Sequence, residues 1–108
     1  MEASATTKKI RFLSFVVPVK DERDTLEPLA LQILKIVDGV TGGENRTEIV
    51  FVDDGSVDGS WSLMKRLTEE HPGRIFAVRL RRNFGKAASL EAGFRQAKGN
   101  IVFTMDAD

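Results

Sequence analysis

Apolar residues along this chain gather into four short and nearly continuous runs. The runs lie within residues 12–17, 48–52, 75–80 and 100–105. Runs of this length, with little alternation between apolar and polar positions, are typical of strands that are buried on both faces of a sheet. The pattern therefore predicts four buried strands, the first ending at Pro18 and the third entered through Arg74.

The segment after the first run has the spacing of an amphipathic helix. Asp24 is the expected N-cap, and Glu27, three residues later, would complete a capping box. Gly39 and the pair Gly42-Gly43 are expected to end the helix. Its apolar face is expected to consist of Leu26, Leu29, Ala30, Ile33, Leu34 and Val37.

Two further helices are predicted between the remaining runs. Asp58 is expected to cap the first of them, and His71-Pro72-Gly73 is expected to end it. The second extends from about Lys86 to Ala97 and is terminated by Gly99. The residues expected to point inward are Trp61, Leu63, Met64 and Leu67 in the first helix, and Leu90, Phe94 and Ala97 in the second.

Strands and helices thus alternate as βαβαβαβ. This order is typical of an α/β fold with a Rossmann-like parallel sheet and helices on both faces. In such sheets, ligands bind beyond the carboxyl ends of the strands, where the strand order reverses. The loops that follow the strands are therefore the segments in which chemistry is expected.

Acidic residues follow two of the predicted strands. Asp53-Asp54 comes after the second strand, and Asp106-Ala107-Asp108 comes after the fourth. If these strands are neighbours, four carboxylates gather at one edge and repel one another unless a cation or hydrogen-bond donors lie among them. Such oxygen ligands suit Mg²⁺ or Mn²⁺, which in this setting also holds phosphate oxygens. The simpler interpretation is a solvated acidic turn, and residues 53–59 also suit a turn followed by a helix cap.

Other features of the strand-end loops are compatible with a nucleotide. One aspartate of the pair Asp53-Asp54 can face a ligand while the other orients the neighbouring backbone. The basic loop at residues 81–86 can meet a diphosphate through cationic side chains and the amides of a helix N-terminus. Residues 18–22 can frame a base. Both loops can also be plain charged surface. Neither a P-loop nor a G-x-G-x-x-G motif is present, which disfavours the folds that carry them.

Composition limits the remaining possibilities. A chain of 108 residues forms at most one small domain, and equal numbers of basic and acidic residues, 16 of each, argue against a nucleic-acid-binding module. The absence of cysteine excludes disulfides and thiolate chemistry. Residues 1–9 are interpreted as a flexible tail without a secretory signal, and no apolar stretch approaches the roughly 20 residues that span a bilayer. A cytoplasmic location is therefore expected.

With these motifs the chain resembles the family-2 glycosyltransferases of GT-A fold. Within that family it is similar to the polyprenyl-phosphate sugar transferases, such as dolichol-phosphate mannose synthase and bacterial undecaprenyl-phosphate enzymes. The similarity covers almost everything after residue 11, in family order. The matching stretches are residues 16–22, 48–59, 82–88 and 99–108, of which the strand followed by Asp53-Asp54-Gly55-Ser56 and the final Asp106-Ala107-Asp108 are the specific ones.

The resemblance implies roles for individual residues in a sugar-nucleotide site. Pro18 and Glu22 would border the nucleotide, and Val52 and Asp54 would contact its base. Lys20 stands where the family often has an aromatic residue, so no ring is present there to stack on the base. The family's metal and donor diphosphate are held by its final motif, which here is Asp106, Ala107 and Asp108, with Asp106 and Asp108 as ligands of Mg²⁺ or Mn²⁺ and Lys86 near the phosphates.

The resemblance also implies an activity. The parent enzyme would be a hexosyltransferase that moves a sugar from a UDP- or GDP-sugar to a lipid-linked phosphate with inversion, at the cytoplasmic face of the membrane. Residues 10–108 would be its nucleotide-sugar-binding half, and the general base, the acceptor site and any membrane helices would lie beyond residue 108. This piece alone is expected to be inactive or nearly so.

Two other interpretations remain open. The chain can be a non-catalytic α/β interaction module, in which the carboxylates are surface charges and an exposed sheet edge pairs with another chain. It can also be a nucleotidyltransferase with a similar sheet. That class usually opens with a glycine-rich basic loop after the first strand, and residues 18–22 contain no glycine.

Overall fold

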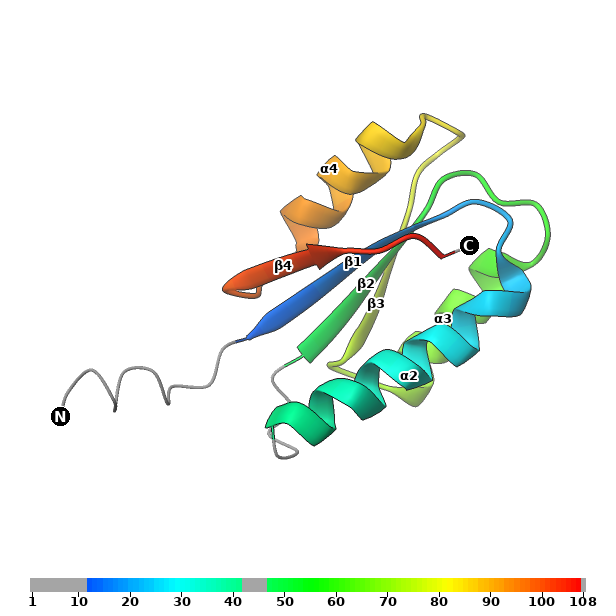
Figure 1. The fold of residues 1–108 in the computed structure, drawn as a ribbon. Coiled ribbons are helices and arrows are strands. Elements are labelled where there is room, and N and C mark those ends of the chain that lie inside the picture. Colours follow the sequence, from blue (N-terminus) through cyan, green and yellow to red (C-terminus); the bar gives the residue numbers. More distant parts are fainter. Residues whose placement is uncertain (1–11, 42–46, 108) are drawn as a thin grey trace, which may run out of the picture.

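The computed structural model describes residues 12–41 and 47–107 as one four-stranded parallel sheet with helices on both faces (Figure 1). The predicted α/β class is confirmed. The predicted tail at residues 1–9, the Gly42-Gly43 pair and Asp108 lie outside the described residues. The strands are β1 (Leu13–Val19), β2 (Thr47–Asp53), β3 (Ile75–Arg79) and β4 (Ile101–Thr104), and the helices are α2 (Arg23–Thr41), α3 (Ser60–Glu70) and α4 (Lys86–Gln96).

The strand order is β3-β2-β1-β4, so β1 lies between the two strands that carry the acidic motifs. β1 pairs with β2 from Leu13↔Thr47 to Val19↔Asp53, and with β4 from Leu13↔Ile101 to Val16↔Thr104. The gathering of four carboxylates was expected on the condition that β2 and β4 are neighbouring strands. They are not neighbours, because β1 lies between them. The chain steps outward from β1 to β3 and then returns through α4 to the other side of β1, which makes the β1–β4 border the point where strand order reverses.

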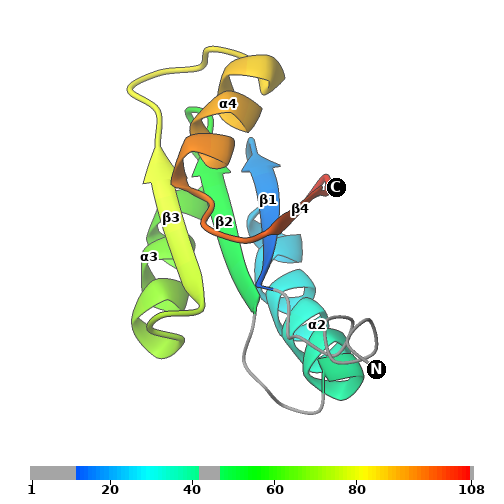
Figure 2. The same ribbon diagram turned by 90° about the vertical axis from the view of Figure 1, so that its left-hand side faces the viewer.

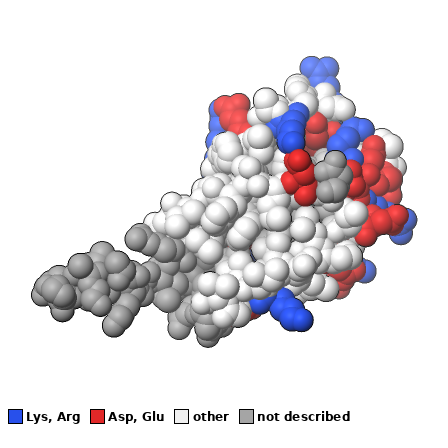
Figure 3. Space-filling view, in the orientation of Figure 1, with Lys and Arg blue, Asp and Glu red and all other residues white. Residues whose placement is uncertain are grey.

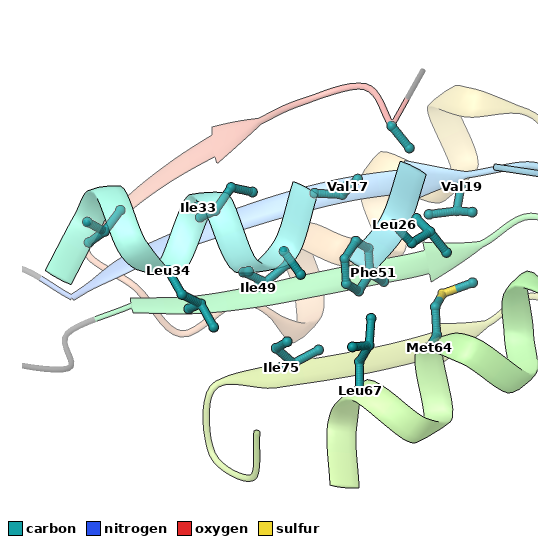
Figure 4. Packing of buried hydrophobic residues seen from close by; sticks show 13 residues of the cluster. Val17, Val19, Leu26, Ile33, Leu34, Ile49, Phe51, Met64, Leu67 and Ile75 are labelled. Atoms are coloured by element: carbon teal, nitrogen blue, oxygen red, sulfur yellow. The ribbon is translucent and has the colours of Figure 1, made fainter. Parts of the chain in front are cut away.

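Helices α2 and α3 cover one face of the sheet, and their apolar sides form the larger core (Figure 4). Leu26 and Ala30 of α2 and Met64 and Leu67 of α3 are fully buried against Phe51 of β2. The predicted inward faces of both helices are confirmed, although Leu29, Trp61 and Leu63 are only partly buried. This packing fixes where α2 and α3 begin, and hence the loops before them.

Helix α4 covers the opposite face, over Val16, Val50 and Val52 (Figure 2). Leu90 and Ala97 pack there as predicted, but Phe94 is 49% exposed, so its predicted inward orientation is wrong. The position of α4 nearest the sheet is Gly93, where a Cβ atom would collide with the side chain of Val16. The adjacent residue is turned about 100° further round the helix, away from the sheet.

The starts of the helices differ from the predicted caps. Helix α2 begins at Arg23, so Asp24 lies inside its first turn, and Glu27 forms a 2.6 Å ion pair with Arg66 instead of a capping box. Gly39 lies within α2 and does not end it. Gly59 is the N-cap of α3, yet Asp58 still accepts a hydrogen bond from a first-turn N–H of that helix. The reason is tertiary, because Asp58 also accepts from Arg23 N–H at 3.1 Å and so serves both helix starts.

Strand β4 was predicted to be buried, and this prediction is wrong. Ile101, Val102 and Phe103 are 41%, 40% and 44% exposed, because β4 is an edge strand that pairs only with β1. Phe103 stacks on Phe15 with ring centroids 5.0 Å apart. Within residues 12–41 and 47–107, no helix combines the length and the hydropathy needed to cross a bilayer.

Candidate functional site

The loops after β1, β2 and β4 converge with the start of α4 on a cavity of about 250 Å³. This is the end of the sheet at which the charged side chains gather (Figure 3). Seven of the nine residues predicted for the site line the cavity, together with Val19 and Ser89. The seven are Pro18, Lys20, Glu22, Asp54, Lys86, Asp106 and Ala107.

The other two predicted residues are Val52 and Asp108. Val52 is fully buried beneath α4, in a cluster with Val16 and Val50, and its side chain faces the core. Asp108 lies outside the described residues. The structure therefore brings together the predicted residues of three separate loops, and it leaves Val52 as a support of the strand below the cavity.

Lys20 forms one side of the cavity. Its Nζ atom lies 3.0 Å from Asp21 Oδ2. The hydrogen bond and the charge of Asp21 raise the pKa of Lys20, and the carboxylates of Asp54 and Asp53 act in the same direction. Lys20 thus presents an ammonium group to the cavity.

Asp54 connects β2 to the start of α4. Its side chain is 6% exposed, and its two oxygens accept hydrogen bonds from Phe84 N–H at 2.7 Å and Gly85 N–H at 3.0 Å. Amides at a helix N-terminus favour an anion, and here that anion is a carboxylate of the protein itself. One interpretation of the sequence had amides at this helix start meeting a diphosphate, but Phe84 N–H and Gly85 N–H are bound to Asp54.

Asp53 is fully buried and shapes the turn after β2. Its Oδ1 atom accepts a hydrogen bond from Ser56 N–H at 3.1 Å, and its Oδ2 atom lies 3.6 Å from Arg79 Nε. Gly55 follows with a φ of +83°, and a Cβ atom there would lie 2.9 Å from Asn83 N. The aspartate pair is therefore divided: Asp53 organises the backbone and Asp54 lines the cavity.

The basic loop at residues 81–86 is split between two hollows. Only Lys86 lines the cavity described above. Arg81 and Arg82 line a separate, open hollow of about 610 Å³, on the side of the β2–α3 loop. Of the cations in this loop, Lys86 is thus the one placed to meet a ligand beside Asp106.

Asp106 and Lys86 form an ion pair on the cavity wall, with Lys86 Nζ 2.6 Å from Asp106 Oδ1. Among the described residues, no group of three His, Cys, Asp or Glu side chains is arranged to hold a metal ion. Mg²⁺ and related ions commonly take one or two carboxylates and complete their shell with water and substrate phosphates. The exposed carboxylate of Asp106 on the cavity wall fits that mode of binding.

The structure adds two residues that the sequence did not single out. Ser89 is fully buried on α4, and its hydroxyl donates to Gly85 O at 3.2 Å while it lines the cavity. Its position one turn after Lys86 is the signal that could have identified it. Asp21 does not line the cavity, but it contacts Lys20, which does.

The end of the described chain is fixed to α2. The hydroxyl of Thr25 donates to the carbonyl oxygen of Ala107 at 2.7 Å, and Ala107 is 6% exposed. Met105 N–H donates to Val16 O at 3.1 Å, which extends the pairing with β1 past β4. The segment that carries Asp106 is therefore held in place from both sides.

Curated relatives of this chain are undecaprenyl-phosphate 4-deoxy-4-formamido-L-arabinose transferases. The protein of Edwardsiella ictaluri is 39% identical over 101 residues, which is 94% of this chain and 30% of the relative. That of Pseudomonas savastanoi pv. phaseolicola is 41% identical over 100 residues, covering 92% of this chain and 28% of the relative. The chain thus spans about 30% of the length of these relatives.

Two solved structures share the fold. The mannosyltransferase PcManGT from Pyrobaculum calidifontis, in complex with GDP-Man and Mn²⁺, superposes with a TM-score of 0.72 at 31% identity, over 93% of this chain and 28% of that one. S. aureus TarS superposes with a TM-score of 0.68 at 20% identity, over 89% of this chain and 16% of that one. The second likeness shows the fold alone.

The family model described as glycosyl transferase family 2 matches residues 14–108. This range contains the four strands except Leu13, the first residue of β1, and it includes every described residue that lines the cavity. The chain belongs to glycosyl transferase family 2.

Proposed function

We propose that residues 10–108 bind the nucleotide-sugar donor of a glycosyltransferase. The observation that carries this proposal is the convergence of three strand-end loops on one cavity. Its walls carry two cations, Lys20 and Lys86, and three carboxylates, Glu22, Asp54 and Asp106. A nucleoside diphosphate joined to a sugar offers both the phosphate oxygens and the polar base edge that such walls would bind.

The proposed contacts follow from the place of each residue in the lining of the cavity. Pro18, Lys20 and Glu22 border the nucleotide from the end of β1, and Asp54 closes the cavity from the end of β2. Lys86 lies near the phosphates. Val52 supports this end of β2 from beneath, since its own side chain is buried.

A divalent cation, Mg²⁺ or Mn²⁺, is proposed as the cofactor, held by Asp106 and Asp108 together with Ala107 and the donor diphosphate. When bound, such an ion offsets the negative charge that builds on the leaving diphosphate. The similarity to a mannosyltransferase solved with GDP-Man and Mn²⁺ supports this assignment. Lys86, beside Asp106, would add a second positive charge for the same phosphates.

The proposed acceptor is a polyprenyl phosphate, supported by the undecaprenyl phosphate in the names of the curated relatives. A phosphate oxygen of the acceptor would form a bond to the anomeric carbon while the bond from that carbon to the nucleoside diphosphate breaks, with inversion. The base that assists this step and the acceptor site would lie beyond residue 108, and the parent would act at the cytoplasmic face of a membrane. The described piece alone would be inactive or nearly so.

The sugar is proposed only as a glycosyl unit. A hexose was expected, and PcManGT is solved with GDP-Man, the donor of a hexose. The curated relatives instead carry an arabinose derivative, a pentose, in their name. The nucleotide is a uridine or guanosine diphosphate.

Thermal denaturation with added ligand tests the proposal, since a ligand that binds only the folded state raises the melting temperature. We expect UDP or GDP, with Mn²⁺ or Mg²⁺, to raise the melting temperature of the chain. Asp106→Asn combined with Asp108→Asn should abolish the metal-dependent part. Glu69→Gln, an exposed carboxylate of α3 away from the cavity, is the matched control. No shift at millimolar ligand, or an equal shift in the double variant, would contradict the proposal.

The exposed edge at β4 favours a second candidate, a non-catalytic interaction module. In that case, size-exclusion chromatography would show concentration-dependent association while nucleotides and metal leave the melting temperature unchanged. The two candidates are therefore separated by the ligand response.

A further inference from the structure

Asp21 has an unusual backbone conformation. Its φ is +56°, and it is the one non-glycine residue with positive φ in the described part of the chain. Aspartate tolerates this left-handed region better than most residues, but the conformation is still strained and persists only where the surroundings fix it. The strained residue lies between Lys20 and Glu22, which both line the cavity.

The surroundings fix Asp21 through three hydrogen bonds. Its own N–H donates to Ser56 Oγ at 2.8 Å, and its Oδ1 atom accepts from Val57 N–H at 2.7 Å. Its Oδ2 atom accepts from Lys20 Nζ at 3.0 Å. Main chain and side chain of Asp21 thus clamp the β1–α2 loop to the β2–α3 loop.

The residues on either side of Asp21 both line the cavity, whereas Asp21 itself does not. The left-handed turn at this position lets the chain leave β1 and enter α2 with only three intervening residues. The next residue extends the contact to the start of α3, since Glu22 N–H donates to Ser60 Oγ at 3.2 Å. The placement of Lys20 and Glu22 at the cavity therefore depends on the clamp.

We propose that Asp21 is a positioning residue for nucleotide binding, acting through Lys20 and Glu22 rather than by touching the ligand. The ammonium of Lys20 is held at the cavity wall by Asp21 Oδ2, and the loop that carries both residues is held by the bonds to Ser56 and Val57. This inference rests on the proposed donor site. It adds Asp21, which does not itself line the cavity, to the residues that determine affinity.

The test is isothermal titration of UDP and GDP, each with Mn²⁺, into the full chain and three variants. Asp21→Gly keeps the left-handed backbone at no steric cost but loses both side-chain bonds. We expect roughly 3- to 10-fold weaker nucleotide binding, the size of one or two lost hydrogen bonds, and a modest fall in melting temperature because the same bonds stabilise the fold. Asp21→Asn tolerates the left-handed region and keeps an oxygen for Val57 N–H, but its amide nitrogen cannot accept from Lys20 Nζ. Its affinity should therefore lie between that of the original chain and that of Asp21→Gly.

The control is Asp38→Asn, which weakens the paired contact of Asp38 with Arg74 at the opposite end of the sheet. It should lower stability and leave nucleotide affinity unchanged. The hydrogen-exchange rate of the Val57 amide reports independently on its hydrogen bond to Asp21 Oδ1. We expect this amide to exchange faster in Asp21→Gly and to remain protected in Asp21→Asn.

The titrations distinguish failure of the donor site from failure of the positioning role of Asp21. If the original chain binds neither nucleotide, the donor site itself fails and the inference fails with it. If the original chain binds and Asp21→Gly binds equally well, the donor site stands and the positioning role is overturned. Equal weakening by Asp38→Asn would show that affinity follows general stability, which also overturns it.

Discussion

Lys86 Nζ lies 2.6 Å from Asp106 Oδ1, which joins the first residue of α4 to the second residue after β4. Both side chains are more than half exposed, so a pair of this kind adds little to stability. Its importance is its place on the cavity wall, where a cation and a carboxylate from distant parts of the chain meet. A phosphate beside Lys86 and a metal ion beside Asp106 could share this space.

Replacing Lys86 should therefore affect the phosphates more than the base. We expect Lys86→Met to weaken the binding of UDP or GDP roughly 10- to 100-fold, because a hydrogen bond to a charged group contributes about 1.5–3 kcal/mol. Binding of uridine or guanosine should hardly change. Titration calorimetry on the four ligands measures the difference, with Lys65→Met on α3 as the control. An equal loss for nucleosides and diphosphates would show that Lys86 does not contact phosphate.

Two glycines in helices should respond in opposite directions to the same substitution. Gly93→Ala introduces a Cβ atom that collides with Val16, and we expect the free energy of unfolding to fall by about 1–3 kcal/mol. Gly39→Ala meets no atom within 4 Å and should raise it by about 0.5–1 kcal/mol through helix propensity. Urea denaturation of both variants checks the prediction. Stabilisation by Gly93→Ala would mean that α4 lies further from the sheet.

Acid should weaken the fold through carboxylates that are bound in the native state. The Val57 N–H, followed by the ammonium of Lys20, holds the pKa of Asp21 below its ordinary 3.8, and the hydrogen bond from Arg74 does the same for the pKa of Asp38. A lowered native pKa gives stability that is present above the unfolded value and is lost as the pH falls through the native one. We expect the free energy of unfolding to decline below about pH 5 and to keep falling below pH 3.8.

Denaturation at several pH values measures this decline, and Asp38→Asn should make it shallower. Above pH 5 the same variant should show a constant deficit in stability relative to the original chain. A pH profile that is identical in the two proteins would contradict the assignment of Asp38 as one of the groups responsible.

The edge at β4 should support self-association. Its four residues, Ile-Val-Phe-Thr, carry no charge, and edge strands without charged or proline residues readily pair with other strands. The formal net charge of zero opposes association little. We expect size-exclusion chromatography to show a larger species as concentration rises, and Val102→Lys to remove it. A monomer at every concentration would contradict this prediction.

Much of the fold follows from local pattern. The four strands, the order of elements and the inward faces of α2 and α3 are set by apolar spacing, which is read along the sequence without knowledge of the tertiary structure. The wrong prediction for Phe94 has a tertiary cause that local pattern does not contain. Phe94 was placed inward by helical spacing, and only the close approach of Gly93 to Val16 turns it outward.

Most residues of the site could be predicted from the sequence, but their hydrogen-bond partners could not. Residues at strand ends, such as Asp54 and Asp106, could be found because parallel strands bring their carboxyl ends to one edge. The partners of those residues could not. The bonds of Asp54 to the amides before α4, and of Asp21 to Val57, join segments about 30 residues or more apart, and no periodicity reports such contacts.

The central claim is that a cation and a nucleotide meet at Asp106, and paramagnetic broadening by Mn²⁺ tests it most directly. With UDP or GDP present, substoichiometric Mn²⁺ should broaden the amide signals of Asp106, Ala107 and Lys86 in a ¹⁵N spectrum while those of Glu69 and Glu70 on α3 remain sharp. Without nucleotide the effect should be weaker. Broadening spread evenly over acidic surface residues, or none around Asp106, would contradict the proposed donor site.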